Sequence, residues 1–323
     1  MSDAPLLEVE NLQKSFGGIT AVDGVSFELE AGKVTGLIGP NGAGKTTTFN
    51  LVSGFYKPDA GTIRFKGTDT QTLMRPAPVE QGVWASASAG FLGLIGAASG
   101  RVTYGVSPDV LAGGAVAGAA VGVGLYVGQN AINNRRGAYK HSRPFRLARQ
   151  GMVRTFQITR ELTEMTVLEN LLLAPPDQTG EGPLNAIVRR GTIAEEEAQF
   201  RERAEEIIEL LELDHLRDEE AGNLSGGQRK LLELGRVLML DPDLVMLDEP
   251  VAGVNPALTD RIMEAITSMR DEGYGFCIVE HEMDVIMSLS DKIIAMAEGQ
   301  KMAEGPPEEV QQDEQVLESY LGG

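Results

Sequence analysis

The sequence predicts an α/β fold, in which helices flank a parallel sheet and a smaller antiparallel sheet accompanies it. The first supporting observation is an apolar run at residues 34–38, followed by a glycine-rich loop and a helical pattern. The second is an apolar run at residues 244–247 that ends in two carboxylates. The third is the alternation of strand and helix patterns around these runs and around "GFCIVE".

The composition limits the class of protein. The 323 residues suffice for one large or two ordinary domains, and a hydrophobic content of 42% excludes a disordered chain. The net charge of −19 argues against a nucleic-acid partner, because phosphate binding needs a basic face. Such an acid excess suits solubility at high salt, so we expect a halophilic source; an ordinary acidic cytosolic protein is the alternative.

The single cysteine and the N-terminal residues indicate the compartment. Cys277 excludes an internal disulfide and lies in an apolar run, so we expect a buried core thiol in a reducing compartment. Residues 1–16 are acidic and lack a basic-then-apolar signal pattern. We therefore expect the chain to start and remain in the cytoplasm.

The N-terminal part contains the most specific motif. Strands at about residues 6–10, 25–30 and 61–66 should form the antiparallel sheet. Between them, "GPNGAGKT" at residues 39–46 stands in the order strand, loop, helix. Its glycines let backbone N–H groups close around phosphate oxygens, while Lys45 should reach the β- and γ-phosphates and Thr46 should ligate Mg²⁺. A turn of purely structural use is the alternative.

Two further stretches favour a nucleotide site. In "DPDLVMLDEP", Asp248 follows a buried strand and could hold the Mg²⁺ shell, and Glu249 could polarise an attacking water. In "LSGGQ", residues 224–228, Ser225 can cap a helix whose N-terminus is a second anion site. Two such sites in one chain suggest a composite site closed by a second subunit; a simple N-cap is the alternative.

These motifs resemble those of the ATP-binding cassette (ABC) ATPases. "GPNGAGKTT" is similar to their Walker A motif, "LSGGQ" to their signature and "LVMLDEP" to their Walker B motif. Gln157 in "VRTFQ" resembles the Q-loop glutamine, and His281 in "CIVEHEM" resembles the switch histidine. The stretches "SFGGITAVDGVSFEL", "MTVLENLL" and "LDEPVAGVNP" resemble the LivG-type ATPase of branched-chain amino acid importers. Relatives of that type serve urea, short-chain amides and lipopolysaccharide export.

The resemblance implies a P-loop NTPase core with an antiparallel β subdomain and a helical subdomain, using ATP and Mg²⁺. The catalytic residues would be Glu249 as general base, His281 at the γ-phosphate and Gln157 as a sensor. The metal would be held by Thr46, Gln157 and Asp248. The nucleotide would be bound by Phe16, Gly39, Pro40, Asn41, Gly42, Ala43, Gly44, Lys45, Thr46, Thr47, Ser225, Gly226, Gly227 and Gln228. Phe16 as a core aromatic and His281 as a strand-end histidine remain the alternatives.

The same resemblance implies partners and a location. Ser225 and Gly227 would reach ATP held by a facing ATPase, either a related chain or a second copy. Two transmembrane permease subunits would lie above this dimer at the cytoplasmic face of the plasma membrane. An extracellular binding protein would supply the substrate indirectly. The segment "AGVNP" has Asn255 where the superfamily often has Asp, which supports the LivG type.

The remaining elements are predominantly helical. Residues 158–238 should be mostly helical, with "EEEAQFRERAEEIIELLEL" presenting an apolar face at Ile207, Leu210 and Leu211 and a solvated acidic face. "APPDQTGEGP" should be a loop, and residues 305–323 should form a short helical region.

One segment interrupts the family pattern. The cassette occupies residues 1–75 and 148–323, and residues 76–147 form an insertion that we predict to be a helical hairpin. It contains two uncharged 19-residue segments, residues 82–100 and 110–128, with glycines four apart. Between residues 129 and 150 there are basic residues and no acid, as on the cytoplasmic side of membrane spans.

The free energy of membrane insertion limits the interpretation of these segments as membrane spans. The five Val, Leu, Ile and Phe residues of the first segment contribute only about −1.5 to −3 kcal/mol, so the two segments would insert together. The alternatives are a helical hairpin packed on the ATPase or its permease, and a mobile insertion. We expect residues 82–128 to contact the membrane or brace the permease contact.

Other functions remain open at this point. They are uptake of urea or amides, lipid export, a soluble ABC protein acting on ribosomes or DNA, and a membrane-anchored regulatory ATPase without permeases. The soluble alternative usually carries two cassettes or long coiled coils, and this chain shows neither.

Overall fold

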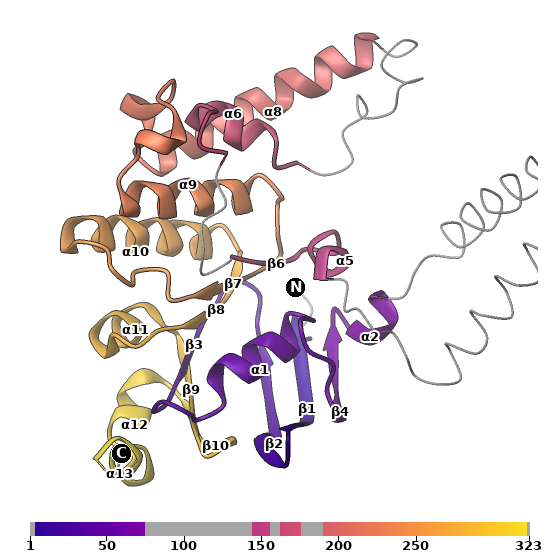
Figure 1. Cartoon of the computed structure of the whole chain (residues 1–323), viewed down its shortest axis with the longest axis vertical. Coiled ribbons are helices and arrows are strands. Elements are labelled where there is room, and N and C mark those ends of the chain that lie inside the picture. Colours follow the sequence, from indigo (N-terminus) through magenta and orange to yellow (C-terminus); the bar gives the residue numbers. More distant parts are fainter. Residues whose placement is uncertain (1–3, 75–143, 156–161, 176–189, 322–323) are drawn as a thin grey trace, which may run out of the picture. The chain divides into compact units, whose positions relative to one another are not determined.

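The structure is a computed structural model that describes residues 4–74, 144–155, 162–175 and 190–321 (Figure 1). Contacts divide the chain into two units, one of Met1–Leu73 with Arg143–Gly323 and one of Met74–Ser142. Every element below lies in the first unit. The two uncharged segments, residues 82–100 and 110–128, belong to the second unit and lie outside the described residues.

A four-stranded antiparallel sheet contains most of the N-terminal residues, in the order β2-β1-β4-β5. Its strands are β1 (Leu7–Phe16), β2 (Ile19–Leu29), β4 (Ala60–Phe65) and β5 (Thr68–Asp69). The antiparallel subdomain is therefore confirmed, but β1 and β2 are longer than expected. Gly17 and Gly18, with φ of 55° and 90°, form a two-residue hairpin turn that lets both strands continue.

A six-stranded sheet forms the centre of the unit, in the order β10-β9-β3-β8-β7-β6. Its strands are β3 (Val34–Ile38), β6 (Met152–Arg154), β7 (Leu244–Asp248), β8 (Gly275–Val279), β9 (Lys292–Ala297) and β10 (Gln300–Gly305). All neighbours pair in parallel except β9 and β10. Every residue of β3, β7 and β8 is buried, which explains their continuous apolar sequences and confirms the predicted parallel sheet.

Helices pack around this sheet. They are α1 (Lys45–Val52), α10 (Pro256–Asp271), α11 (Met283–Leu289), α12 (Pro307–Gln311) and α13 (Glu314–Leu321). Ile266 of α10 and Ile286 of α11 are fully buried in the same core as Val34 and Phe276 of the sheet. The C-terminal helices α12 and α13 confirm the helical region expected at residues 305–323.

Three more helices form a second layer, seen together at the top of Figure 1: α6 (Val167–Leu172), α8 (Arg190–Leu210) and α9 (Gly226–Leu238). They pack closely at Gly235 of α9, where a Cβ would lie 3.0 Å from Leu171 Cδ2 and 3.0 Å from Leu211 Cδ1. Two short 3₁₀ turns, Asp214–Leu216 and Ala221–Asn223, connect α8 to α9. The helical expectation for residues 158–238 is confirmed where the structure describes them; the predicted loop at residues 174–183 lies mostly outside.

Two short helices flank the boundary between the units, α2 (Thr70–Leu73) and α5 (Pro144–Ala148). Leu147 of α5 is buried, and α5 contacts β6. Residues 144–147, which the sequence analysis assigned to the insertion, group with the first unit. Within the four described ranges, no helix has the length and apolar character needed to cross a bilayer.

The single cysteine lies in the central strand β8. Cys277 is buried, as expected, and burial raises the pKa of its thiol to about 12. At neutral pH the side chain is therefore a protonated thiol without nucleophilic character.

Candidate nucleotide-binding and hydrolysis site

The glycine-rich loop lies at the carboxyl end of β3 and leads directly into α1. Gly39 has a φ of 149°, and a Cβ at this position would lie 2.1 Å from the Met296 carbonyl oxygen. Gly44 has a φ of 95°, and a Cβ there would lie 2.4 Å from the Ala21 carbonyl oxygen. A side chain is therefore excluded at Gly39 and Gly44, and α1 begins without a side-chain cap. Its first N–H groups suit an anion.

Lys45 supplies a buried cation to this loop. Its Nζ donates to the carbonyl oxygens of Gly39 at 2.6 Å and Pro40 at 3.1 Å. Burial lowers the pKa of Lys45, and the nearby charge of Glu249 opposes this shift. No carboxylate of the described residues forms an ion pair with Lys45. An ammonium group held only by carbonyl oxygens fits the charge of a nucleotide phosphate.

Two oxygen donors fit a magnesium ion. Thr46 is exposed in the first turn of α1, and Asp248 is the last residue of β7. Hydroxyl and carboxylate oxygens are the ligands that Mg²⁺ prefers. Asp248 Oδ2 accepts a hydrogen bond from Arg154 at 2.9 Å. Burial raises the pKa of Asp248, and the Arg154 guanidinium counteracts this effect.

Glu249 and His281 lie within hydrogen-bond distance of each other. Their Oε1 and Nε2 atoms are 3.0 Å apart, and both side chains are partly open to solvent. Glu249 has a φ of 53°, an unfavourable conformation for a residue with a side chain. Its N–H donates to the Val279 carbonyl oxygen at 2.9 Å, which joins the ends of β7 and β8. This arrangement can position and deprotonate a water.

Two residues that the sequence analysis did not identify form hydrogen bonds with the loop that follows β7, residues 249–252. Lys230 of α9 donates to the carbonyl oxygens of Glu249 at 3.0 Å and Ala252 at 2.7 Å. Glu280, which is buried, accepts from the N–H groups of Val251 at 2.9 Å and His281 at 3.1 Å. Glu280 was visible in "CIVEHEM" as an acid inside an apolar run, a combination that calls for hydrogen-bond partners.

The signature residues begin α9. Ser225 and Gln228 form a reciprocal capping box: Ser225 Oγ accepts from the Gln228 N–H at 3.3 Å, and Gln228 Oε1 accepts from the Ser225 N–H at 2.9 Å. Gly227 packs against α10, where a Cβ would lie 2.5 Å from Leu258 Cδ1. Gly226 faces open space. The predicted cap is confirmed, and the contact with a second nucleotide stays a prediction.

Phe16 lies at the end of β1 with 42% of its surface exposed, so it is not a core residue. Its ring makes an edge contact with Tyr56 at 5.4 Å between centroids, and Lys14 Nζ lies 5.5 Å from its centroid. This exposed aromatic ring on the β1–β2 hairpin is available for stacking on a base.

The remaining predicted residues have distinct outcomes. Gln157 lies outside the described residues. Asn255 caps α10, because its Oδ1 accepts from the Leu258 N–H at 3.0 Å, and Pro256 occupies the first turn. Since Asn and Asp are equivalent in such a cap, the departure from the superfamily pattern has a structural explanation.

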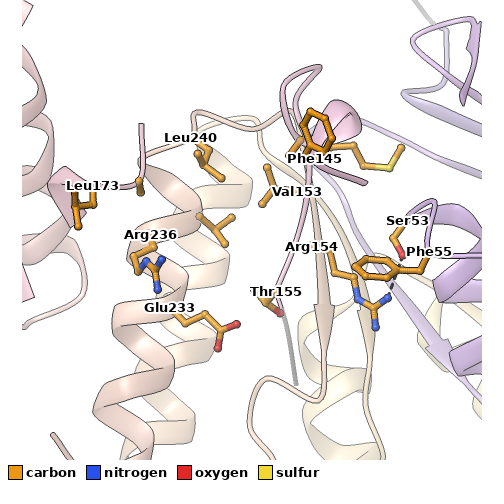
Figure 2. A pocket seen from close by; sticks show the side chains of 14 residues that line it. Ser53, Phe55, Phe145, Val153, Arg154, Thr155, Leu173, Glu233, Arg236 and Leu240 are labelled. Atoms are coloured by element: carbon orange, nitrogen blue, oxygen red, sulfur yellow. Dashed lines mark hydrogen bonds between the residues drawn. The ribbon is translucent and has the colours of Figure 1, made fainter. Parts of the chain in front are cut away.

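A cavity of about 510 Å³ lies beside this site, between β6 and α9 (Figure 2). Arg154, Phe55 and Ser53 lie together on one wall, and Glu233 and Arg236 of α9 lie on the opposite wall. Phe145 and Leu173, both about half exposed, lie at its edges. Arg154 therefore contacts both the cavity and Asp248.

The chain is similar in sequence and in fold to known ATP-binding cassettes. The family model described as "ABC transporter" matches residues 22–91 and 125–252. A solved nucleotide-free ATP-binding cassette from an ABC transporter is 33% identical, with a TM-score of 0.65 over 99% of this chain and 100% of its own. The ADP conformation of an ATP-binding cassette matches equally well, at 33% identity and a TM-score of 0.65. The chain belongs to the ABC transporter family and is one of its ATP-binding cassette ATPases.

Similar proteins of known type indicate which kind of ABC transporter ATPase the chain resembles. A probable branched-chain amino acid transport ATP-binding protein LivG of Archaeoglobus fulgidus is 36% identical over 98% of this chain and 95% of its own length. The high-affinity branched-chain amino acid transport ATP-binding proteins BraF of Pseudomonas aeruginosa and LivG of Escherichia coli K12 are each 32% identical over 98% of both chains. A model for branched-chain amino acid ATP-binding cassette transporters matches residues 300–323. The expected resemblance to the LivG type is confirmed.

Proposed function

We propose that this chain hydrolyses ATP to drive an importer of branched-chain or related polar amino acids. The observation that carries the hydrolytic part is the contact between Glu249 and His281, whose side chains lie 3.0 Å apart beside the ends of β7 and β8. The charge of Glu249 also acts on Lys45, and this proximity supports a single site that includes the loop and the carboxylates. The substrate class is supported by the relatives, which are branched-chain amino acid transport ATP-binding proteins.

In the proposed mechanism the chain's own groups bind, orient and deprotonate. Phe16 stacks on adenine, and the backbone of residues 39–47 surrounds the phosphates. Lys45 binds the β- and γ-phosphates, and Glu249 accepts the proton of the attacking water while His281 orients it toward the γ-phosphate. Thr46, Gln157 and Asp248 would hold Mg²⁺, which would neutralise phosphate charge.

The proposed assembly contains two ATPases and two permeases. Residues 225–228 complete the nucleotide site of a facing ATPase, either a related chain or a second copy. The dimer works at the cytoplasmic face of the plasma membrane, and an extracellular binding protein delivers the amino acid. Nucleic acid has no part in the assembly.

The insertion is proposed as an addition to the common cassette. The ABC transporter model matches on both sides and leaves residues 92–124 unmatched. We propose that residues 82–128 contact the membrane or brace the permease contact. Deletion of these residues should release the chain from membranes after an alkaline carbonate wash; unchanged recruitment and unchanged coupled hydrolysis would refute this.

The transport function is tested with the chain reconstituted with its permease subunits and binding protein in vesicles. Labelled leucine should accumulate only with ATP, and the Glu249→Gln variant should abolish uptake. Urea and acetamide, added as competitors, should not reduce leucine uptake. ATP-dependent uptake of urea but not leucine would reassign the substrate and leave the ATPase assignment intact.

A further inference from the structure

The Arg154 guanidinium contacts two aromatic rings and three hydrogen-bond acceptors near the site. It lies at the end of the edge strand β6, and its side chain is 13% exposed. Its Cζ is 4.6 Å from the centroid of the Phe49 ring and 4.8 Å from that of Phe55. Two aromatic faces therefore contact the same cation, a stabilising arrangement where water is excluded.

The guanidinium also connects two elements through hydrogen bonds. Its Nη1 donates to Asn50 Oδ1 on α1 and to Ser53 Oγ, just after α1, at 3.1 Å. Its Nη2 donates to Asp248 Oδ2 at 2.9 Å. No described residue donates a hydrogen bond to the other oxygen of Asp248, Oδ1. One oxygen is thus fixed and the other is left for a further ligand.

The hydrogen bonds of Arg154 connect Asp248 to α1, two parts of the site that come from strands that are not neighbours in the sheet. Thr46 lies in the first turn of α1, which follows β3, whereas Asp248 ends β7, and β8 lies between these two strands. We propose that Arg154 is a positioning residue that holds the Asp248 carboxylate at a fixed place relative to α1, so that Asp248 and Thr46 meet the same metal ion. This inference rests on the metal role proposed above for these two residues.

The contacts of Arg154 favour the positioning role over that of a counter-ion that the metal would displace from Asp248. A counter-ion that gives way to the metal would need freedom to leave the carboxylate. Arg154 is held by Phe49, Phe55, Asn50 and Ser53 independently of Asp248, so it stays in place when the metal arrives. A planar guanidinium holds both hydrogen-bond directions in a fixed fork and can stack on aromatic rings, whereas a lysine ammonium is a point charge on a flexible stem.

The test measures metal binding rather than turnover. The purified full chain is loaded with a non-hydrolysable ATP analogue, and Mn²⁺ affinity is measured from the electron paramagnetic resonance signal of free Mn²⁺. Arg154→Gln should weaken Mn²⁺ binding about tenfold, as expected for loss of a group that orients a metal ligand. Binding of the analogue in excess EDTA should stay within about twofold of the wild type, because the phosphate loop is unchanged.

Four further variants complete the experiment. Asp248→Asn should weaken Mn²⁺ binding on its own, and adding Arg154→Gln to it should have little further effect, because the two residues act as one unit. Arg154→Lys should keep part of the affinity and supports the test if Arg154→Gln fails to fold. Arg64→Gln removes a guanidinium paired with Glu10 at 3.0 Å on the antiparallel sheet and should leave Mn²⁺ binding unchanged.

The outcomes separate this inference from the proposed function. Unchanged or tighter Mn²⁺ binding in both Arg154 variants, with weakened binding in Asp248→Asn, would overturn the positioning role alone. Unchanged binding in Asp248→Asn as well would overturn the metal role of Asp248 and with it this inference.

Discussion

The phosphate loop and the carboxylate edge of the sheet are built in different ways. The loop consists of contiguous residues, 39–46, and its geometry depends on Gly39 and Gly44, where neighbouring backbone leaves no room for a side chain. The carboxylate edge combines Asp248, Glu249 and His281, and side chains from other elements hold it in place. Backbone sterics determine the first region, and hydrogen bonds between distant residues determine the second.

This comparison has a practical consequence for mutagenesis. Substitutions in the loop should act through steric conflict with neighbouring backbone. Substitutions at the carboxylate edge should act through charge and hydrogen bonding. The following experiments compare the two mechanisms, beginning with the largest expected effect.

Removal of the Glu249 carboxylate should have the largest effect. Glu249→Gln is expected to lower ATP hydrolysis by about 10²–10⁴-fold, the usual contribution of a general base, with nucleotide binding retained. Phosphate release measures the first quantity and a fluorescent ATP analogue the second. The matched control is Glu282→Gln, an exposed acid just before α11, which should hydrolyse ATP normally. Equal losses in both variants would contradict a specific role for Glu249.

A methyl group in the phosphate loop should have the next largest effect. Gly44→Ala would place a Cβ 2.4 Å from the Ala21 carbonyl oxygen, at a φ of 95°. We expect a loss of about 1–3 kcal/mol in the free energy of unfolding and weaker nucleotide binding. Gly42→Ala is the control, since its φ is 82° but nothing lies within 4 Å of the added atom, so its loss should be smaller. Chemical denaturation measures both; equal losses would show that the clash has no influence.

The buried carboxyl of Glu280 should make stability depend on pH. Burial raises the pKa of Glu280, and hydrogen bonds from Val251 and His281 only partly oppose this. Because the folded-state pKa lies above the unfolded-state pKa, this group destabilises the fold as pH rises through that interval. The melting temperature of Glu280→Gln should therefore improve relative to the wild type as pH rises from about 4 to 8. A difference that is constant across this range would refute the expectation.

The cap of α10 should have the smallest effect. Asn255→Ala removes the hydrogen bond from the Leu258 N–H and should lower the free energy of unfolding by about 1 kcal/mol. Asn255→Asp keeps a cap oxygen and should differ from the wild type by less than about 0.5 kcal/mol. Urea denaturation distinguishes them, and a large loss in Asn255→Asp would mean that the amide itself is required.

The same comparison explains what the sequence could predict. The loop, the two carboxylates and the Ser225 cap were predictable because each depends on a few consecutive residues. Arg154 was not, because its partner Asp248 is 94 residues further along the chain, and only the order of strands in the sheet brings β6 beside β7. The arginine is visible in "VRTFQ", but no neighbouring residue in the sequence indicates which carboxylate it contacts.

Two other differences had local signals that could have been used. The Gly-Gly pair at residues 17–18 marks a two-residue hairpin, which would have extended β1 and β2 to their observed ends. Asn255 before Pro256 marks a helix start. Lys230 had no such signal, because its two acceptors are backbone carbonyl oxygens, whose positions depend on the folded loop and not on residue type.

The burial of Cys277 makes this chain a convenient background for spectroscopic labelling. Its only thiol lies in the central strand β8 with a pKa raised to about 12, so maleimide and spin-label reagents should leave it unmodified in the folded protein. A cysteine introduced at Ile19, which is 74% exposed in the β1–β2 hairpin, would then carry the label alone. Distances between such labels would test whether two copies of the chain approach each other when ATP is added, without any prior removal of the native cysteine.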